Sequence, residues 1–107
     1  MALSRSDLNA LLGLQVDRYE ESSQGAYAQI DIADCAGQWA AALDRIQSIR
    51  TIIPRLISAG SIRTPSLDVA MVFPHSSLSE SLIIPADLAA AAGEAGIDIQ
   101  LSVYKTD

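Results

Sequence analysis

The single histidine of the chain, His75, is the residue with the widest choice of chemistry. It follows a predicted strand that contains Asp68, and Ser76 and Ser77 come directly after it. A Ser-His-Asp arrangement requires the acid to orient the ring and the ring to reach the hydroxyl in space, and the spacing here guarantees neither. Serines in such turns commonly bond the turn backbone. The sequence therefore favours an exposed loop histidine, and it predicts no catalytic residue.

Two tyrosines are the other candidates for contacting a ligand or a partner. Tyr27 and Tyr104 fall on the polar sides of predicted strands, so if these strands are neighbours, both rings lie on one open sheet face. Such a face is a common place for a partner or a small molecule to dock. Together with Asp68 and His75, these tyrosines are the predicted ligand-binding or partner-binding residues.

The set of donors for metals and cofactors is small. With one histidine and one cysteine, the ligands would have to be carboxylates, and no D-x-D-x-D-G loop is present. Glu20 with Glu21, or Asp31 with Asp34, could bind a hard cation weakly, but a solvated acidic surface explains both pairs. The nucleotide-binding motifs G-x-x-x-x-G-K-[ST] and G-x-G-x-x-G do not occur. We therefore predict no metal site and no cofactor, and we expect Cys35 to be a small buried residue.

Charge and cysteine content restrict the partners and the location. The 107 residues carry a formal net charge of −6 and no Lys/Arg-dense run with interleaved aromatics, so the sequence predicts no nucleic-acid partner. One cysteine allows no intramolecular disulfide. The sequence has no signal-peptide pattern and no run of about 18 apolar residues. We expect a cytoplasmic protein that does not contact a membrane.

Apolar spacing and capping residues predict two short helices and a long one. Residues 4–13 and 85–96 each combine a typical start, an apolar face and a final glycine. Asp34 is the predicted cap of the long helix, in which Trp39 heads an apolar stripe and is expected to anchor the core. Pro54 interrupts this stripe and should kink or divide the helix. The polar residues between the first helix and the first predicted strand are expected to form a loop.

Alternating apolar and polar residues predict the strands, at residues 26–33, 67–73 and 97–104, with a brief one at 82–84. With the helices, this gives the order β, α, β, β, α, β, the split βαβ pattern of ferredoxin-like domains. The predicted fold is a single α+β domain over residues 1–107. It has an antiparallel sheet of about four strands, helices packed on one face and an extra N-terminal helix.

Both ends of the chain resemble a known family. The stretch "LNALLGLQVDRYEESSQG" is similar to the opening of small bacterial domains of unknown function (domain of unknown function 4279), and "SLIIPADLAAAAGEAGIDIQLSVY" is similar to their ending, which closes on Tyr104. This family has no established activity. The resemblance therefore implies a compact α+β domain and no catalytic residue. By analogy it implies a partner-binding or toxin-neutralising protein.

The sequence is compatible with two functions. The absence of a reactive motif and the open sheet favour a non-catalytic protein-interaction module, immunity-like or regulatory, that binds a protein partner or itself. Edge pairing through the strand at residues 97–104 is one route to a homodimer. The alternative is a small-molecule-binding protein or small enzyme that uses the open sheet face or the loop around His75. This alternative requires a pocket that holds several of the candidate residues together.

Overall fold

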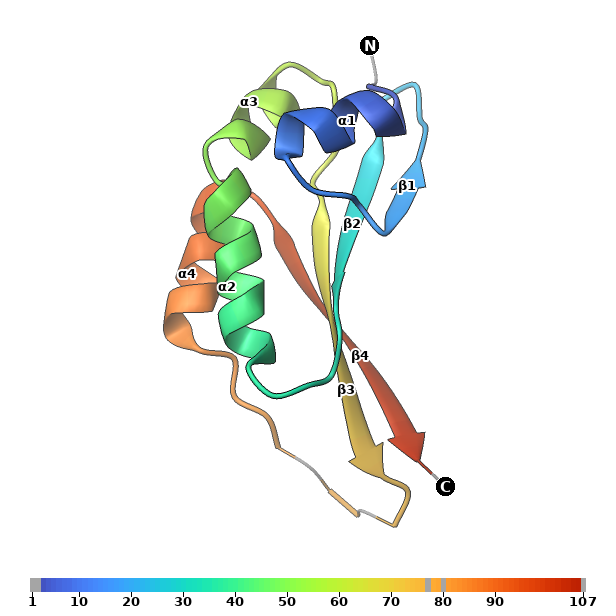
Figure 1. Cartoon of the computed structure of the whole chain (residues 1–107), viewed down its shortest axis with the longest axis vertical. Helices are drawn as coiled ribbons and strands as arrows, with labels where there is room; N and C mark the ends of the chain where they lie inside the picture. The colour runs from blue at the N-terminus through green and yellow to red at the C-terminus, as the bar shows by residue number, and fades with distance from the viewer. Residues whose placement is uncertain (1–2, 77, 80, 107) are drawn as a thin grey trace.

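The computed structural model describes residues 3–76, 78–79 and 81–106, and it combines helices with one mixed sheet (Figure 1). Within these residues, the helices are α1 (Arg5–Leu12), α2 (Gln38–Ile49), α3 (Ile52–Ser58) and α4 (Ala86–Ala95). The strands are β1 (Arg18–Glu20), β2 (Tyr27–Ile32), β3 (Ser66–Pro74) and β4 (Asp98–Thr106). The predicted α+β class is confirmed. The polar segment that we expected to be a loop contains β1.

The strands lie in the order β1-β2-β3-β4. β1 pairs antiparallel with β2, but β2 with β3 and β3 with β4 are parallel. The prediction of an antiparallel, ferredoxin-like sheet is therefore wrong. That arrangement requires a strand at residues 82–84, and this segment belongs to no strand of the sheet. Each crossover after β2 consequently carries a helix and returns the next strand parallel to the last one.

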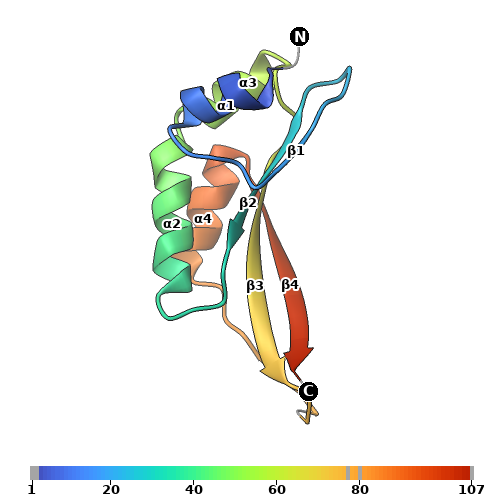
Figure 2. The ribbon, with the colours of Figure 1, turned by 45° about the vertical axis from the view of Figure 1, so that its right-hand side comes forward.

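The helices lie on one side of the sheet, as predicted (Figure 2). Successive crossovers of the same hand that advance in one direction place their helices on the same face. The opposite face carries no helix in the described part of the chain. Parallel strands are normally covered on both faces, so a bare face on β2, β3 and β4 is unusual. This face is the natural place to look for a site.

The core fills the space between the helices and the covered sheet face. Its largest fully buried side chains come from α1, α2, α3, α4, β3 and two connecting segments: Leu8, Val16, Ile46, Ile49, Ile53, Ile62, Leu67, Val69 and Leu88. Trp39, which we predicted to be a core anchor, is only partly buried and packs against the rim of this core. It lies in the first turn of α2, where the helix passes the end of the core.

The start of α2 also differs from the prediction. Asp34 does not cap the helix, because the N-cap is Gly37, whose φ of 80° is in the left-handed region. The carboxylate of Asp34 instead accepts a hydrogen bond from the Val72 amide at 2.8 Å. Cys35, in the same connection, is exposed, so its predicted burial is wrong. The connection needs a left-handed residue to turn into α2, and this geometry holds residues 33–37 outside the core.

The predicted long helix is divided into α2 and α3. The break lies at Arg50 and Thr51, and Pro54 is the third residue of α3. The first turn of a helix has no intrahelical acceptor for its amides, so proline fits there at no cost in hydrogen bonds. Pro54 therefore marks a helix start instead of a kink.

The molecule is elongated, with extents of 47 × 27 × 20 Å. Its radius of gyration is 14.9 Å, whereas about 13 Å is typical of a compact domain of this length. The cause is visible in Figures 1 and 2, where the carboxyl-terminal halves of β3 and β4 project beyond the helices. We call residues 70–74 of β3 and 102–106 of β4, which pair with one another, the β-ribbon.

Candidate functional site

The centre of the bare sheet face is a hydrogen-bonded network around Gln29. The hydroxyl of Tyr27 donates to Gln29 Oε1 at 3.1 Å. Gln29 Nε2 donates to Asp31 Oδ1 at 2.8 Å and to Asp68 Oδ2 at 3.4 Å. Arg63 lies over the Tyr27 ring, 5.8 Å from its centroid. Gln29 is only 8% exposed although no helix covers it, so its neighbours shield it.

The network joins three strands through Asp68. Asp31 and Asp68 are directly opposite in the parallel register of β2 and β3, and like charges in this position repel one another. The amide group of Gln29 offsets this repulsion by donating to both. From β4, Ser102 Oγ lies 2.7 and 2.9 Å from the two oxygens of Asp68. Among the described residues, no buried side-chain nitrogen or oxygen lacks a partner. The network is thus internally satisfied, which suits a structural role.

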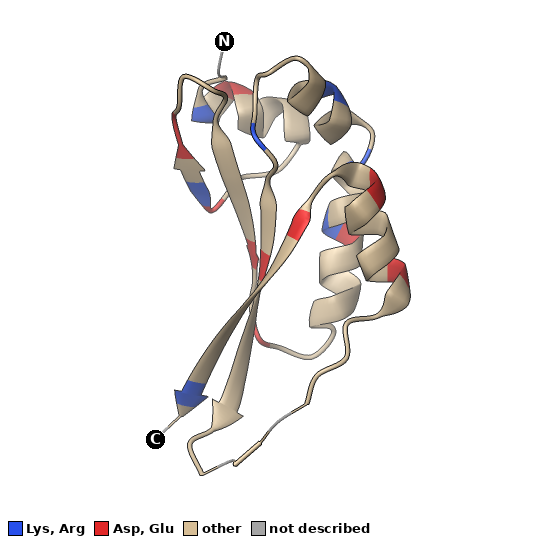
Figure 3. Cartoon of the chain, turned by 180° about the vertical axis from the view of Figure 1, so that it is seen from behind, with Lys and Arg blue, Asp and Glu red and all other residues tan. Residues whose placement is uncertain are grey.

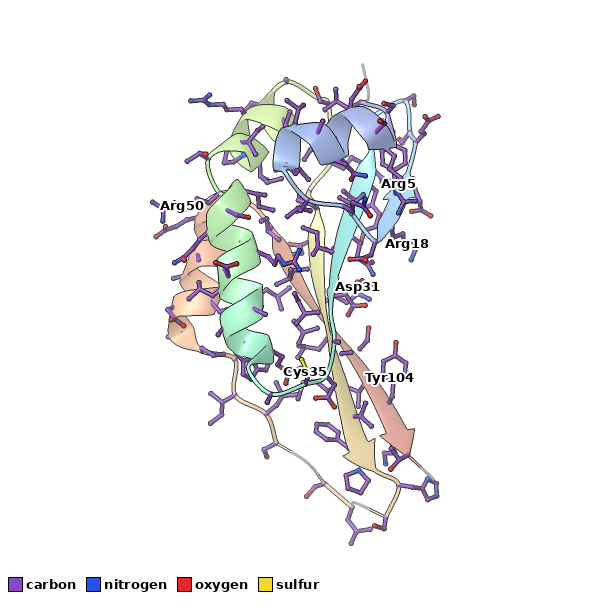
Figure 4. All side chains as sticks on the ribbon, viewed as in Figure 1. Arg5, Arg18, Asp31, Cys35, Arg50 and Tyr104 are labelled. Atoms are coloured by element: carbon purple, nitrogen blue, oxygen red, sulfur yellow. The ribbon has the colours of Figure 1, made fainter. Side chains whose placement is uncertain are left out.

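The β1 side of this face is also internally paired. Asp17 Oδ2 accepts from the Asp31 amide at 2.7 Å, and this side chain continues the hydrogen-bonding pattern of β2 beyond the start of β1. Arg18 and Glu20 form a salt bridge at 3.0 Å. The hydrogen bond that Arg18 donates to Glu20, followed by the charge of Glu20, raises the pKa of Arg18. Figure 4 shows Arg18 and Asp31 on the side of the sheet away from α2 and α4.

The carboxylates of this face do not form a metal site. In residues 3–76, 78–79 and 81–106, no group of three or more His, Cys, Asp or Glu side chains is arranged to hold a metal ion. Asp31 and Asp68 use their oxygens on Gln29 and Ser102, and Asp17 uses its carboxylate on a backbone amide. These carboxylates therefore accept hydrogen bonds from groups of the protein itself.

The β-ribbon differs from this polar centre. Large exposed apolar side chains are concentrated on the ribbon and in the segment that follows it. Val72, Val103 and Tyr104 lie on the ribbon, and Leu78 and Ile83 lie between the ribbon and α4. Only Leu11, among the described large apolar residues with high exposure, lies elsewhere. Residues 69–74 and 99–104 include no charged residue. Figure 3 accordingly shows the ribbon in tan apart from one blue stretch near the end of β4.

The structure separates the four predicted site residues into three places. Tyr27 and Asp68 belong to the network and are linked through Gln29. Tyr104 lies on the same sheet face, but further along β4, opposite Val72, and it is 57% exposed (Figure 4). His75 is exposed in the turn after β3. Within the described residues it makes no hydrogen bond with the other three.

Two open pockets that are lined by described residues lie elsewhere. One of about 230 Å³ is lined by Trp39, Leu43 and Pro85, between α2 and the start of α4. Another, of about 240 Å³, lies between α3 and the end of α4, beside Pro54 and Gly96. Neither is lined by a predicted site residue. An enclosed apolar cavity in the core measures only about 10 Å³.

Gln29 and Ser102 were not predicted as site residues, although the sequence contained part of the signal. Alternation along residues 26–33 places Gln29 on the same side as Tyr27 and Asp31. Their connection to Asp68 and Ser102 depends on the order of the strands, which alternation does not give.

Comparisons with family models, with curated proteins and with solved structures find no match to this chain. The resemblance to a bacterial domain family stays a prediction. In the part of the chain that the structure describes, no helix has the length and apolar character required of a membrane span.

Proposed function

We propose that this protein is a non-catalytic protein-interaction module that binds its partner through the β-ribbon. The observation that carries the proposal is the concentration of exposed apolar side chains on the ribbon and the segment that follows it. Apolar residues scattered singly over a surface are normal, whereas a cluster of them marks an interaction site. Tyrosine in particular is enriched at protein interfaces.

The surroundings of the ribbon support the same function. The chain has a net charge of −6, but the ribbon contains no acidic residue and Lys105 is its one charged residue. The acidic groups are therefore kept away from the place where a partner would lose water. A strand edge also offers backbone donors and acceptors, which add hydrogen bonds to the apolar contact. The satisfied network around Gln29 holds three strands together next to the ribbon, on the same sheet face as Val72 and Tyr104.

The alternative, a small-molecule site or an enzyme around His75, receives no comparable support. It requires several candidate groups in one pocket, and the structure disperses Tyr27, His75 and Tyr104 along the sheet. The same proposal includes a cytoplasmic location and no nucleic-acid partner, on the basis of cysteine usage and charge.

The experiment compares two ribbon variants with one control variant, all in the full chain. Tyr104→Ser and Val72→Ser remove apolar surface from the ribbon, and Leu11→Ser removes it from α1 as a matched control, since Leu11 is also half-exposed. Binding is measured as self-association by light scattering and as retention of proteins from a lysate of the source cells. We expect the ribbon variants to lose a partner that the wild type and Leu11→Ser retain. Equal retention by all of them, or no partner for any, would contradict the proposal.

A further inference from the structure

The free edge of β4 has the properties of a self-pairing strand, and we infer that the partner is a second copy of this chain. The inference rests on the proposed function and adds the identity of the partner and its geometry. Each β4 lies antiparallel to β4 of the other copy about a twofold axis that is perpendicular to the sheet. Two mixed sheets then become one continuous sheet, with the helices of both copies on the same side.

The backbone of β4 has a complete set of groups available for this pairing. The Asp98 amide donates to the carbonyl of Pro65 at 2.9 Å, so the backbone of Asp98 faces β3. Directions alternate along a strand, and the even-numbered residues of β4 therefore face β3 as well. The backbones of Ile99, Leu101, Val103 and Lys105 face the free edge. None of the hydrogen bonds between described residues outside the β3–β4 pairing uses these four backbones.

The other edge of the β-ribbon shows what a protected edge looks like in this molecule. β2 ends at Ile32, so residues 70–74 of β3 would also have an open edge. There, Asp34 accepts from the Val72 amide at 2.8 Å and Gln38 Nε2 donates to the Ala70 carbonyl at 3.0 Å. Natural proteins protect edges in this way, and also with prolines, bulges or charges. β4 carries charges only near its two ends, at Asp98 and Lys105, and its nine residues pair with β3 without a bulge.

The sequence of β4 is self-complementary when the axis passes through Ser102. This register pairs all nine residues, Asp98–Thr106, and places Leu101 opposite Val103 and Gln100 opposite Tyr104 of the other copy. Four outward-facing residues in each copy form four pairs of two bonds, or about eight backbone hydrogen bonds. Leu101 with Val103 also gives an apolar contact on the helix side of the sheet.

The shape of the molecule fits the same register. The first half of β4 lies beside α4, and its second half belongs to the projecting ribbon (Figure 1). Antiparallel pairing about Ser102 places the projecting half of one copy next to the helix-covered half of the other. Val103, which is 53% exposed, then lies beside the helical layer of its partner. Residues 99–104 carry no charge, so two acidic chains meet where their mutual repulsion is weakest.

Proline at position 103 tests the pairing without removing a β3 hydrogen bond. The Val103 amide faces the free edge, so Val103→Pro preserves the β3–β4 ladder but blocks a second copy. Val103→Ala is the matched control, since it shortens the side chain and keeps the amide. We expect a wild-type dimer in size-exclusion chromatography with light scattering. Val103→Pro should raise its dissociation constant by about 100-fold, because two backbone bonds per dimer are lost and the ring prevents close approach. Circular dichroism verifies that each variant is folded.

Cysteine cross-linking tests the register even if Val103→Pro fails to fold. At the axis, Ser102 lies opposite Ser102 of the other copy as a non-hydrogen-bonded pair, with Cα atoms about 4.5 Å apart. This separation suits a disulfide, for which about 4.4–6.8 Å is required. In a Cys35→Ser background, Ser102→Cys should form a covalent dimer under mild oxidation. Gln100→Cys, which this register places opposite Tyr104, should not.

The outcomes separate this inference from the proposed function. A wild-type monomer that retains another protein through the ribbon would overturn self-pairing and leave the interaction module intact. A dimer that is unchanged in Val103→Pro, or that cross-links through Gln100→Cys and not through Ser102→Cys, would overturn the β4 geometry. A monomer that retains no partner would overturn both.

Discussion

β3 and β4 are buried at one end and exposed at the other, although apolar residues lie on their helix side at both ends. On the helix side of β3, Leu67 and Val69 are fully buried, whereas Met71 and Phe73 are only partly buried. On β4, Ile99 and Leu101 pack against the core and Val103 does not. Apolar residues occupy the helix side at both ends, so the difference in burial comes from what covers the strands.

The two ends also differ in how their polar groups are satisfied. At the covered end, the bare face is held by side-chain hydrogen bonds that link Gln29, Asp68 and Ser102. At the projecting end, the same face presents Val72 and Tyr104 to solvent. A strand that continues past its helices keeps an apolar surface that the rest of the chain does not bury. Such a surface is a binding site when it stays free of charge and has an open edge.

The largest expected difference between the two ends is in the cost of removing a valine. Val69 is 0% exposed and Val103 is 53% exposed, and both lie on the helix side of the sheet. Val69→Ala should lower the free energy of unfolding by about 2 kcal/mol, from lost burial and the cavity that remains. Val103→Ala should change it by about 0.5 kcal/mol or less. Urea denaturation at low protein concentration measures both, and equal losses would show that the ribbon is covered within one copy.

A somewhat smaller effect is expected at Gln29. Gln29→Leu removes the amide between Asp31 and Asp68 and leaves two facing carboxylates without it. The free energy of unfolding should fall by about 1–2 kcal/mol, the range for leaving a largely buried polar group without its partner. Gln100, exposed and opposite Asp68 on the other neighbouring strand, provides the control Gln100→Leu. A control that is as destabilised as Gln29→Leu would mean that the network has no special role.

The boundary between the two ends should respond to Asp34. Asp34→Ala removes the acceptor of the Val72 amide, at an exposed position, so the cost should be about 0.5–1 kcal/mol. Asp34→Asn keeps a side-chain oxygen in place and should lose less. Hydrogen exchange gives a local readout, since the Val72 amide should exchange faster in the alanine variant. Unchanged exchange would show that the carboxylate does not protect this edge.

Local patterns in the sequence predict the elements of this fold better than their arrangement. The first helix has the predicted ends, with Ser4 Oγ accepting from the Asp7 amide and Gly13 in the left-handed region. Alternation correctly locates β2, β3 and β4. The brief apolar run at residues 82–84 resembles a strand in its residue types alone. Within the described residues no strand lies beside it to pair with, so it does not join the sheet. This one segment changes the sheet from antiparallel to mixed.

The candidate site shows the same limit. Tyr27, Asp68 and Tyr104 lie on one sheet face, which alternation indicates for each strand separately. Which of them are neighbours depends on the strand order and on where each strand leaves the helical layer. Cys35 and Trp39 are residues for which the residue type predicts more burial than the structure has. Their residue types favour burial, but both lie at the end of the core where α2 begins. Residue type cannot report that position.

The smallest expected effect is the dependence of stability on alkaline pH at the covered end. Burial, followed by the charge of Glu21, raises the pKa of Tyr19, whose hydroxyl donates to the carbonyl of Leu3. The folded state therefore holds the phenolic proton more tightly than the unfolded state does. Its contribution to stability is fully present below the unfolded pKa of about 10 and is lost as pH rises through the higher folded pKa.

Tyr19→Phe tests this dependence, because it leaves no proton to lose. Wild-type stability should fall as pH rises from about 9.5 to 11, and the fall should be less steep in Tyr19→Phe. A measurement at neutral pH gives the separate cost of the lost hydrogen bond to Leu3. Tyr19 packs against the core and is not part of the ribbon. Near-ultraviolet circular dichroism should therefore show a loss of structure at the covered end. Identical slopes for the two proteins would mean that β1 is not held against the helices as the structure describes.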